Sequence, residues 1–589
     1  MIRRLTSFQG NRRSQPGVVS EGTAWLGGLL LVAAIVLVYQ PVWRAGFIWD
    51  DDFHLTKNPC VVGPVGFWGI WTSRAARICP LVLSSFWLQH ALWGLQPLPY
   101  HLFTVLMHAG AAVVLWRVLA RLQVPGAWLG AALWALHPVQ AESVAWVTEL
   151  KNTQSGLFYM LTALSFVRAR LAEQAQDVNR ARRNDYAALA FGVLAMASKS
   201  STVVLPLVLG LCVWWVERGW RWRSALRLVP YFVLSALTAA LSIWTQRLEG
   251  AGGPEWARSW PERFVTAGKV VWFYLGKLLW PQPLSFIYPK WHIEAWHAAA
   301  FLPLAIVLVV FVGLWLGRER WARGPFLAFA YFLIALLPVL GLLDHFFLRY
   351  SFVGDHFQYL ASVGPLALAG AVLWRAFARV GEGNGVLRLA ACGLLLGVLG
   401  TATWRHAEVF RSDEALWRDT LAKNPGCWMA HCNLGVALAA QGESDEAIQQ
   451  YKQALQLEPD FVEAHNDLAN ELAAQGNLDE AIQHWDRALE LQPNYPQAHN
   501  NLAAHLAKQG KLDEAVKHWE QALQLDPAYA EAEYNLGLTL ARQGKTAEAI
   551  QHFQQALRLA TALDKPSLMA DSQAQLERYR PRPPASAHD

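Results

Sequence analysis

The chain has 589 residues, of which 54% are hydrophobic and only 16% are charged. Soluble domains carry roughly 25% charged residues, so this composition argues against an ordinary soluble protein, and the length excludes a single ordinary domain. The six cysteines show no CxxC spacing, which indicates neither a zinc site nor a disulfide-rich scaffold. Cys60 and Cys79 fall in one predicted outer loop and are the candidate pair.

The net charge of +5 hides two different halves of the chain. From Arg405 onward, 16 Lys and Arg face 27 Asp and Glu, a net charge of −11, whereas the residues before it carry +16. The positive charge lies in short loops between apolar runs, which is the pattern of cytoplasmic loops and not of a nucleic-acid-binding surface. We therefore expect no nucleic-acid partner, and we expect the two halves to lie in different surroundings.

Residues 1–24 form a basic stretch with four arginines, and an apolar run over Trp25–Trp43 follows. The bulky residues at 40–43 do not resemble a signal-peptide cleavage site, so we interpret the run as an uncleaved first membrane span with a cytoplasmic N-terminus. Further apolar runs follow in chain order at 98–119, 127–147, 155–167, 186–197, 203–216, 229–244, 265–280, 298–316, 326–343, 358–377 and 386–404.

Basic clusters between these runs set the predicted topology, since arginine and lysine concentrate in cytoplasmic loops. All of the clusters fall on one side of the membrane only if the run at 265–280 does not cross and is instead a re-entrant or interfacial helix. Eleven crossings then remain, with the C-terminus outside. The clusters are Arg117 with Arg121, the five arginines of 168–183, the four of 218–227, the three of 318–323, and Arg375 with Arg379.

A strict period of 34 residues begins after Ser412, where the sequence becomes rich in Ala, Leu, Gln and Glu. A 34-residue step with small residues where two helices cross, and with proline after the second helix, is the tetratricopeptide pattern. The recurring residues are Leu434, Leu468, Leu502 and Leu536; Gly442, Gly476, Gly510 and Gly544; Ala447, Ala481, Ala515 and Ala549; and Pro425, Pro459, Pro493 and Pro527.

The predicted fold is therefore all-α, a polytopic membrane helical domain of about eleven spans followed by an α-solenoid of tetratricopeptide repeats. The expected parts are a basic cytoplasmic N-terminus at 1–24, a membrane domain at 25–404, a connector and half repeat at 405–427, four repeats at 428–563, a capping helix at 564–580 and a disordered tail at 581–589.

Three consecutive carboxylates, Asp50, Asp51 and Asp52, open the first predicted outer loop. Like charges so close together repel, which tends to raise the pKa of at least one carboxyl group. A carboxylate with a raised pKa suits a general base that takes a proton from a hydroxyl group. The alternatives are a solvated loop or a cation site.

Other ionisable side chains lie at predicted outer span ends, where such groups usually face a cavity rather than lipid. Lys199 is expected at the tip of a hairpin, where an ammonium group can meet a phosphate. The competing interpretations are helix capping, interfacial ion pairs and, for Lys199, a snorkelling side chain. The full set is His137, Glu142, Lys151, Lys199, Asp355 and His356.

These motifs resemble those of the transmembrane and tetratricopeptide-repeat containing O-mannosyltransferases and their bacterial relatives, a family with a GT-C type membrane fold. The resemblance covers nearly the whole chain. It rests on Phe47 to Asp51 with Asn58-Pro59, Tyr100-His101 with His108, His137 to Val139 with Glu142 to Trp146, Lys151-Asn152, Ser198-Lys199 with Leu205-Pro206, Tyr288-Pro289, and Asp355 with Tyr359-Leu360.

The resemblance implies an enzyme that moves a sugar, mannose in this family, from a polyprenyl-phosphate donor to protein hydroxyls on the extracytoplasmic face, with Asp50 or Asp51 as the catalytic base. Family members carry an arginine where this chain has His356, so His356 or Lys199 is expected to replace it. The expected donor-phosphate ligands are Arg77, His137, Lys151, Lys199, Asp355 and His356, with Glu142 as a further site residue.

The donor lipid, membrane lipids and a protein acceptor are the expected partners of such an enzyme. No cofactor is firmly predicted; a divalent metal is not expected, although the Asp-rich loop leaves room for one. A bacterial inner membrane with a periplasmic repeat domain is the expected location. The alternative is a non-catalytic, membrane-anchored scaffold whose repeats recruit other proteins.

The first helix of each repeat carries an amide or acid just before the recurring leucine, and these first helices line the concave groove of such arrays. A side-chain amide both donates and accepts hydrogen bonds, so a row of asparagines can hold a peptide backbone. The row resembles the asparagine ladder of O-linked N-acetylglucosamine transferase. The alternative is that these residues bridge neighbouring helices. They are Asn433, Asn466, Asp467, Asn500, Asn501 and Asn535.

Overall fold

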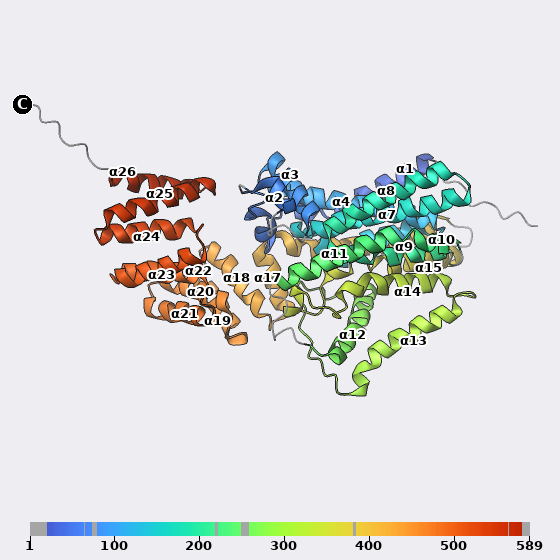
Figure 1. Cartoon of the computed structure of the whole chain (residues 1–589). Coiled ribbons are helices and arrows are strands. Elements are labelled where there is room, and N and C mark those ends of the chain that lie inside the picture. Colours follow the sequence, from blue (N-terminus) through green and yellow to red (C-terminus); the bar gives the residue numbers. More distant parts are fainter. Residues whose placement is uncertain are drawn as a thin grey trace, which may run out of the picture.

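The structure is a computed structural model that describes residues 21–63, 65–72, 79–217, 222–248, 258–380, 385–563 and 565–579. Its described residues form helices and turns without a strand, which confirms the predicted all-α fold. Figure 1 shows two bodies, a large body of long helices and a stack of short helix pairs. Arg77, the basic stretch at 1–20 and the tail at 581–589 lie outside the described residues.

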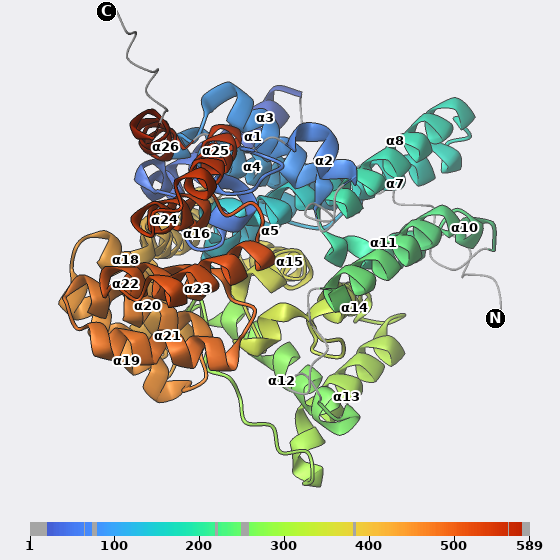
Figure 2. The same cartoon turned by 60° about the vertical axis from the view of Figure 1, so that its left-hand side comes forward.

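The large body contains helices α1–α16, and most of its long helices run in roughly the same direction, whereas α12 and α13 lie apart at a different angle (Figures 1 and 2). The helices are α1 Glu21–Val38, α2 Gly66–Thr72, α3 Pro80–Trp93, α4 Pro97–Arg121, α5 Ala127–Ala135, α6 Ala141–Ala145, α7 Leu150–Gln174, α8 Val178–Ser198, α9 Leu205–Glu217, α10 Trp222–Leu226, α11 Val229–Leu248, α12 Trp260–Leu279, α13 Leu302–Gly317, α14 Arg323–Leu336, α15 Val363–Val380 and α16 Gly385–Ala407.

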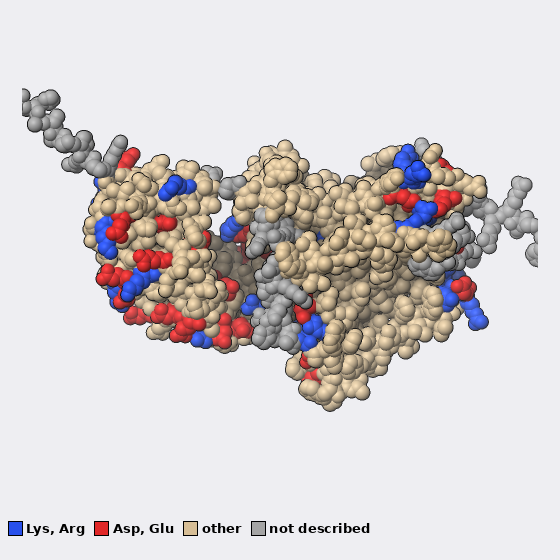
Figure 3. All heavy atoms as spheres, viewed as in Figure 1, with Lys and Arg blue, Asp and Glu red and all other residues tan. Residues whose placement is uncertain are grey.

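Five helical segments among the described residues are long and apolar enough to cross a membrane. In Figure 3 most of the surface of the large body is tan, and its charged side chains gather mainly at the end far from the repeat stack, where blue and red lie together. These features identify a membrane protein, while the count of eleven spans and the orientation stay predictions. The five segments are Pro97–Arg121, Ser200–Glu217, Ser224–Thr245, Ala298–Gly317 and Gly385–Arg411.

Two predicted spans lie inside α7 and α8. These helices are longer than their apolar runs, and they carry charged residues where α7 ends and α8 begins. Arg170 is almost fully buried there, and its guanidinium lies 2.8 Å from the carboxylate of Glu173 and also pairs with Asp185. Arg227 reaches Asp185 at 2.8 Å. Because these charges are paired, the helix ends remain compatible with a membrane interface.

The second body is the repeat stack, in which helices pair in sequence. Each pair turns at a glycine with φ between +81° and +89°, a conformation that side chains rarely adopt. The recurring alanines are fully buried where the paired helices cross. The predicted tetratricopeptide fold is confirmed. The helices are α17 Asp413–Lys423, α18 Trp428–Ala440, α19 Ser444–Leu457, α20 Val462–Ala474, α21 Leu478–Leu491, α22 Pro496–Lys508, α23 Leu512–Leu525, α24 Ala530–Arg542, α25 Thr546–Ala562 and α26 Pro566–Arg578.

Candidate functional site

Asp51 anchors the acidic loop to the turn that precedes α7. Its carboxylate is fully buried and accepts hydrogen bonds from the backbone N–H of Ile48 at 2.9 Å and from the N–H and hydroxyl of Thr148 at 2.8 and 2.6 Å. Burial raises the pKa of Asp51 to about 7; the hydrogen bonds lower it and the charge of Asp50 adds a smaller rise. The sequence prediction of a raised pKa therefore holds here mainly through burial, not through repulsion between carboxylates.

Asp50 has a more open environment than its neighbour. Its side chain is 27% exposed, and one carboxylate oxygen lies 3.5 Å from Nε2 of His54. The other oxygen has no hydrogen-bond partner among the described residues. A π-helical turn at Asp52–Thr56 follows, and such turns often occur at functional sites. Asp50 is thus more open than Asp51, although one of its oxygens is buried and the side chain of Asp52 is more exposed, at 51%.

A buried carboxylate that the sequence analysis missed, Glu149, holds two predicted phosphate ligands together. It lies 3.0 Å from the ammonium group of Lys151 and 3.5 Å from that of Lys199. Burial raises the pKa of Glu149, but the two ammonium groups outweigh this effect and lower it to about 2. Lys199 also donates to Asn152 at 2.6 Å, so it is not a lone snorkelling cation. The cluster retains one excess positive charge.

The lysine pair is connected to the acidic loop through aromatic rings. The ammonium group of Lys151 lies 5.5 Å from the ring centre of Trp146, and Trp146 packs against Trp49 at 5.3 Å. Trp49 immediately precedes Asp50 in the chain. The candidate base and the two cations therefore belong to one local assembly.

His356 is hydrogen-bonded to Glu142 through both its ring and its backbone. Its ring Nδ1 lies 2.7 Å from one carboxylate oxygen of Glu142, and its backbone N–H donates to the other at 3.1 Å. The backbone carbonyl of His356 accepts from the amide of Asn152 at 2.9 Å. This links the motif at 142 to the lysine cluster.

Asp355 and His137 are buried within the protein. Asp355 accepts hydrogen bonds from the hydroxyl of Tyr288 at 3.0 Å and from Gln358 at 3.2 Å. Burial and the nearby charge of Glu142 raise the pKa of Asp355 well above its usual range. Both ring nitrogens of His137 contact backbone groups, namely the Leu278 carbonyl at 3.1 Å and the Val139 N–H at 3.4 Å. Their predicted contact with the donor phosphate stays a prediction, and the geometry favours supporting roles.

A cavity of about 460 Å³ opens beside the lysine cluster. Its polar lining includes Asn152, Lys199, Asp344 and His356, and its apolar lining includes Val203 and Leu360. A second, mainly apolar cavity of about 370 Å³ lies between α4, α7, α9, α14 and α15, and Tyr159 borders both. A polar region that contains the ammonium group of Lys199, joined to apolar walls, suits a lipid with a phosphate headgroup.

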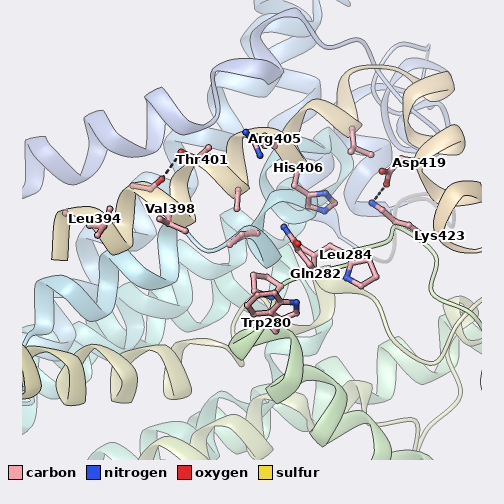
Figure 4. A pocket seen from close by; sticks show the side chains of 17 residues that line it. Trp280, Gln282, Leu284, Leu394, Val398, Thr401, Arg405, His406, Asp419 and Lys423 are labelled. Carbon is pink, nitrogen blue, oxygen red and sulfur yellow. Dashed lines mark hydrogen bonds and ion pairs between the residues drawn. The ribbon is translucent and has the colours of Figure 1, made fainter. Parts of the chain in front are cut away.

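A wider groove of about 1160 Å³ runs along α16 on the side of the repeats. Figure 4 shows its apolar part along Leu394 and Val398, and its polar end around His406 and the Asp419–Lys423 ion pair of α17. Pro138, which follows His137, also lines it.

Three further expectations concern the cysteine pair, a metal site and Arg77. Cys60 and Cys79 are not bonded to each other. Within the described part of the chain, no group of three or more His, Cys, Asp and Glu side chains is arranged to hold a metal ion. Arg77 lies outside the described residues.

The repeat asparagines contact one another across neighbouring repeats. Asn501 donates to Asn466 at 3.2 Å and to Asn470 at 2.9 Å, and Asn535 donates to Asn500 at 3.2 Å. Asn466 and Asn500 are buried. Asn433 instead donates to the Met429 carbonyl of its own helix, and Asp467 accepts from Asn466. This pattern favours bridging of the helices, while peptide binding by the row stays a prediction.

Comparison with known sequences gives two results. The family model described as "TPR repeat" matches residues 435–470, 469–510 and 505–544, and that described as "Tetratricopeptide repeat" matches 530–560. The chain is 26% identical over 536 residues to "Protein O-mannosyl-transferase Tmtc1" of Drosophila melanogaster, covering 72% of this chain, and 24% identical over 525 residues to "Protein O-mannosyl-transferase TMTC1" of Homo sapiens, covering 76%.

The chain spans 60% and 56% of the lengths of these two relatives. Among solved structures, "Crystal structure of MamA" is 23% identical with a TM-score of 0.24, covering 26% of this chain and 89% of that one.

Proposed function

We propose that this chain, which belongs to the family of transmembrane and tetratricopeptide-repeat containing O-mannosyltransferases, transfers a sugar from a polyprenyl phosphate to protein hydroxyls. The names of its relatives indicate that the sugar is mannose. The observation that carries the proposal is the assembly of the partly exposed carboxylate of Asp50 with Lys151 and Lys199, of which Lys199 lines a cavity that has polar and apolar walls. An anchor for a scaffold has no need of such an assembly.

In the proposed reaction the acceptor hydroxyl oxygen attacks the anomeric carbon of the sugar while Asp50 takes the hydroxyl proton. The bond between the anomeric carbon and the phosphate oxygen breaks, and the polyprenyl phosphate leaves with the electron pair. Lys199 and Lys151 stabilise the negative charge that develops on the phosphate. Attack from the face opposite the phosphate inverts the anomeric configuration.

The donor's phosphate would lie beside Lys199 in the first cavity, and its isoprenoid chain would extend along the apolar wall towards the second cavity, which Tyr159 also borders. The repeats would bind the protein acceptor. We place the site and the repeats on the outer face of a bacterial inner membrane, with a cytoplasmic N-terminus. Reporter fusions after Val216 and after Trp404 should then report opposite compartments; the same compartment for both would contradict this topology.

The central experiment uses the purified full-length protein in lipid nanodiscs with polyprenyl-phosphate mannose and a serine- and threonine-containing peptide. Transfer by the wild type and its loss in Asp50→Asn support the proposal. Lys57→Ala, which removes an exposed lysine paired with Asp52, is the matched control and should remain active. Wild-type protein that binds partner proteins but never consumes the donor would favour the alternative, a non-catalytic scaffold.

A further inference from the structure

The first helix of the repeat array contacts the acidic loop directly. The backbone N–H of Trp49 donates to a carboxylate oxygen of Asp413, in the first turn of α17, at 2.8 Å. The N–H of Gly46 donates to the carbonyl of Arg411 at 3.1 Å. Residues 364 positions apart thus meet immediately before the candidate base Asp50.

Trp49 has a backbone conformation that a bulky side chain rarely adopts. Its φ is +45°, in the left-handed region. Such a conformation costs free energy and persists only where the surrounding structure imposes it. Because the backbone of residue 49 determines where the next residue points, this conformation sets the direction of the Asp50 side chain.

Helix α17 contributes much of what surrounds Trp49. The Trp49 ring packs edge-on against two rings. Its centre lies 6.0 Å from the ring centre of Trp417 in α17 and 5.2 Å from that of Phe286. Trp417 is 1% exposed, and its side chain adds a hydrogen bond to the carboxylate of Asp413. One face of α17 therefore holds both the backbone and the ring of Trp49.

We propose that Asp413 and Trp417 are positioning residues for the transfer reaction, and that they act by holding Trp49 in its left-handed conformation so that Asp50 faces the acceptor. The proposal rests on the proposed function for its kinetic consequence. The repeat array then completes the catalytic site as well as recruiting the acceptor. A short peptide that needs no repeat groove still requires α17.

The test compares three full-length variants in nanodiscs. Asp413→Ala removes the acceptor of the Trp49 N–H, Asp413→Asn keeps an oxygen acceptor, and Glu414→Ala changes the adjacent residue of the same turn, whose carboxylate pairs with Arg418 at 2.9 Å. Each is assayed for mannose transfer to a six-residue serine peptide and for amide hydrogen exchange of residues 46–52 by mass spectrometry.

We expect Asp413→Ala to lower kcat about 10- to 100-fold, because a small displacement of a catalytic group has that effect, with KM for the short peptide nearly unchanged. Exchange at 46–52 should accelerate in Asp413→Ala, while Asp413→Asn and Glu414→Ala should resemble the wild type. If Asp413→Ala does not fold, Trp417→Phe, which removes the indole N–H and keeps a ring, should show the same changes to a smaller degree.

Unchanged exchange at 46–52 in Asp413→Ala would overturn the proposed contact. Accelerated exchange with unchanged kcat would overturn the positioning role. Wild-type protein without transfer activity would refute the proposed function and with it the kinetic part of this proposal, whereas the exchange experiment still decides whether α17 holds the loop.

Discussion

Asp50 and Asp51 are neighbours in the chain but lie in different surroundings. The carboxylate of Asp51 is buried and accepts three hydrogen bonds, whereas the side chain of Asp50 is partly exposed. The two substitutions to asparagine should therefore have different effects. Asp50→Asn should reduce transfer by about 100-fold or more with little change in melting temperature. Asp51→Asn places an amide N–H₂ among hydrogen-bond donors and should cost about 1–3 kcal/mol of stability. Equal melting temperatures for both variants would contradict this division.

The pH dependence of stability offers a separate test of Asp51. Burial raises its pKa to about 7, whereas an unfolded aspartate titrates near 4. Between these two pKa values Asp51 is protonated in the folded protein but ionised in the unfolded chain. The contribution of Asp51 to the free energy of unfolding therefore falls as pH rises from about 4 to about 7, and it is constant above that. Melting temperatures of wild type and Asp51→Asn, measured from pH 5 to 8, should show the wild type losing stability relative to the variant. Parallel curves would argue against the buried, raised-pKa carboxyl.

Glu149→Gln should destabilise the protein strongly. The substitution leaves the ammonium groups of Lys151 and Lys199 close together without their buried counter-charge. Removing one partner of a buried ion pair typically costs about 3–5 kcal/mol. Chemical unfolding measures the loss, and the double variant Glu149→Gln with Lys151→Gln should recover part of it. Asp52→Asn, which breaks an exposed pair with Lys57, serves as the control with an effect below about 1 kcal/mol.

In the repeats, Asn500→Ala should destabilise the array while Asn433→Ala should not. The side-chain oxygen of Asn500 accepts from the buried indole N–H of Trp519 at 3.0 Å and from Asn535 at 3.2 Å. Leaving these donors without a partner costs about 1–3 kcal/mol. Asn433 donates only within its own helix among the described contacts. Thermal unfolding followed by circular dichroism distinguishes the two, and equal losses would show that Asn500 does not bridge the repeats.

The repeats were predictable in detail because their pattern is local. A glycine with positive φ and a fully buried alanine are needed once per 34 residues, so both constraints appear directly in the sequence. The long apolar helices were predictable for the same reason, since composition alone determines whether a segment suits lipid.

The site was only partly predictable, because its geometry depends on contacts between distant segments. The motifs identified Asp50, Lys151 and Lys199, which the structure brings into one assembly. Glu149 was missed although it stands two residues before Lys151; nothing in the sequence shows that its carboxylate is buried between two cations. Asp413 resembled an ordinary acidic residue at a helix start, and its contact with Trp49 depends on how two bodies pack.

The membrane body meets the repeats through α17 and the start of α18, where Asn424 donates to the Ile287 carbonyl at 3.2 Å and Trp428 packs against Tyr350. Every later repeat stacks on the one before it. Duplication or deletion of a whole 34-residue unit behind α18 would therefore alter the length of the arm without disturbing the acidic loop. The arm can therefore lengthen or shorten one repeat at a time, while α17 keeps its contact with Trp49.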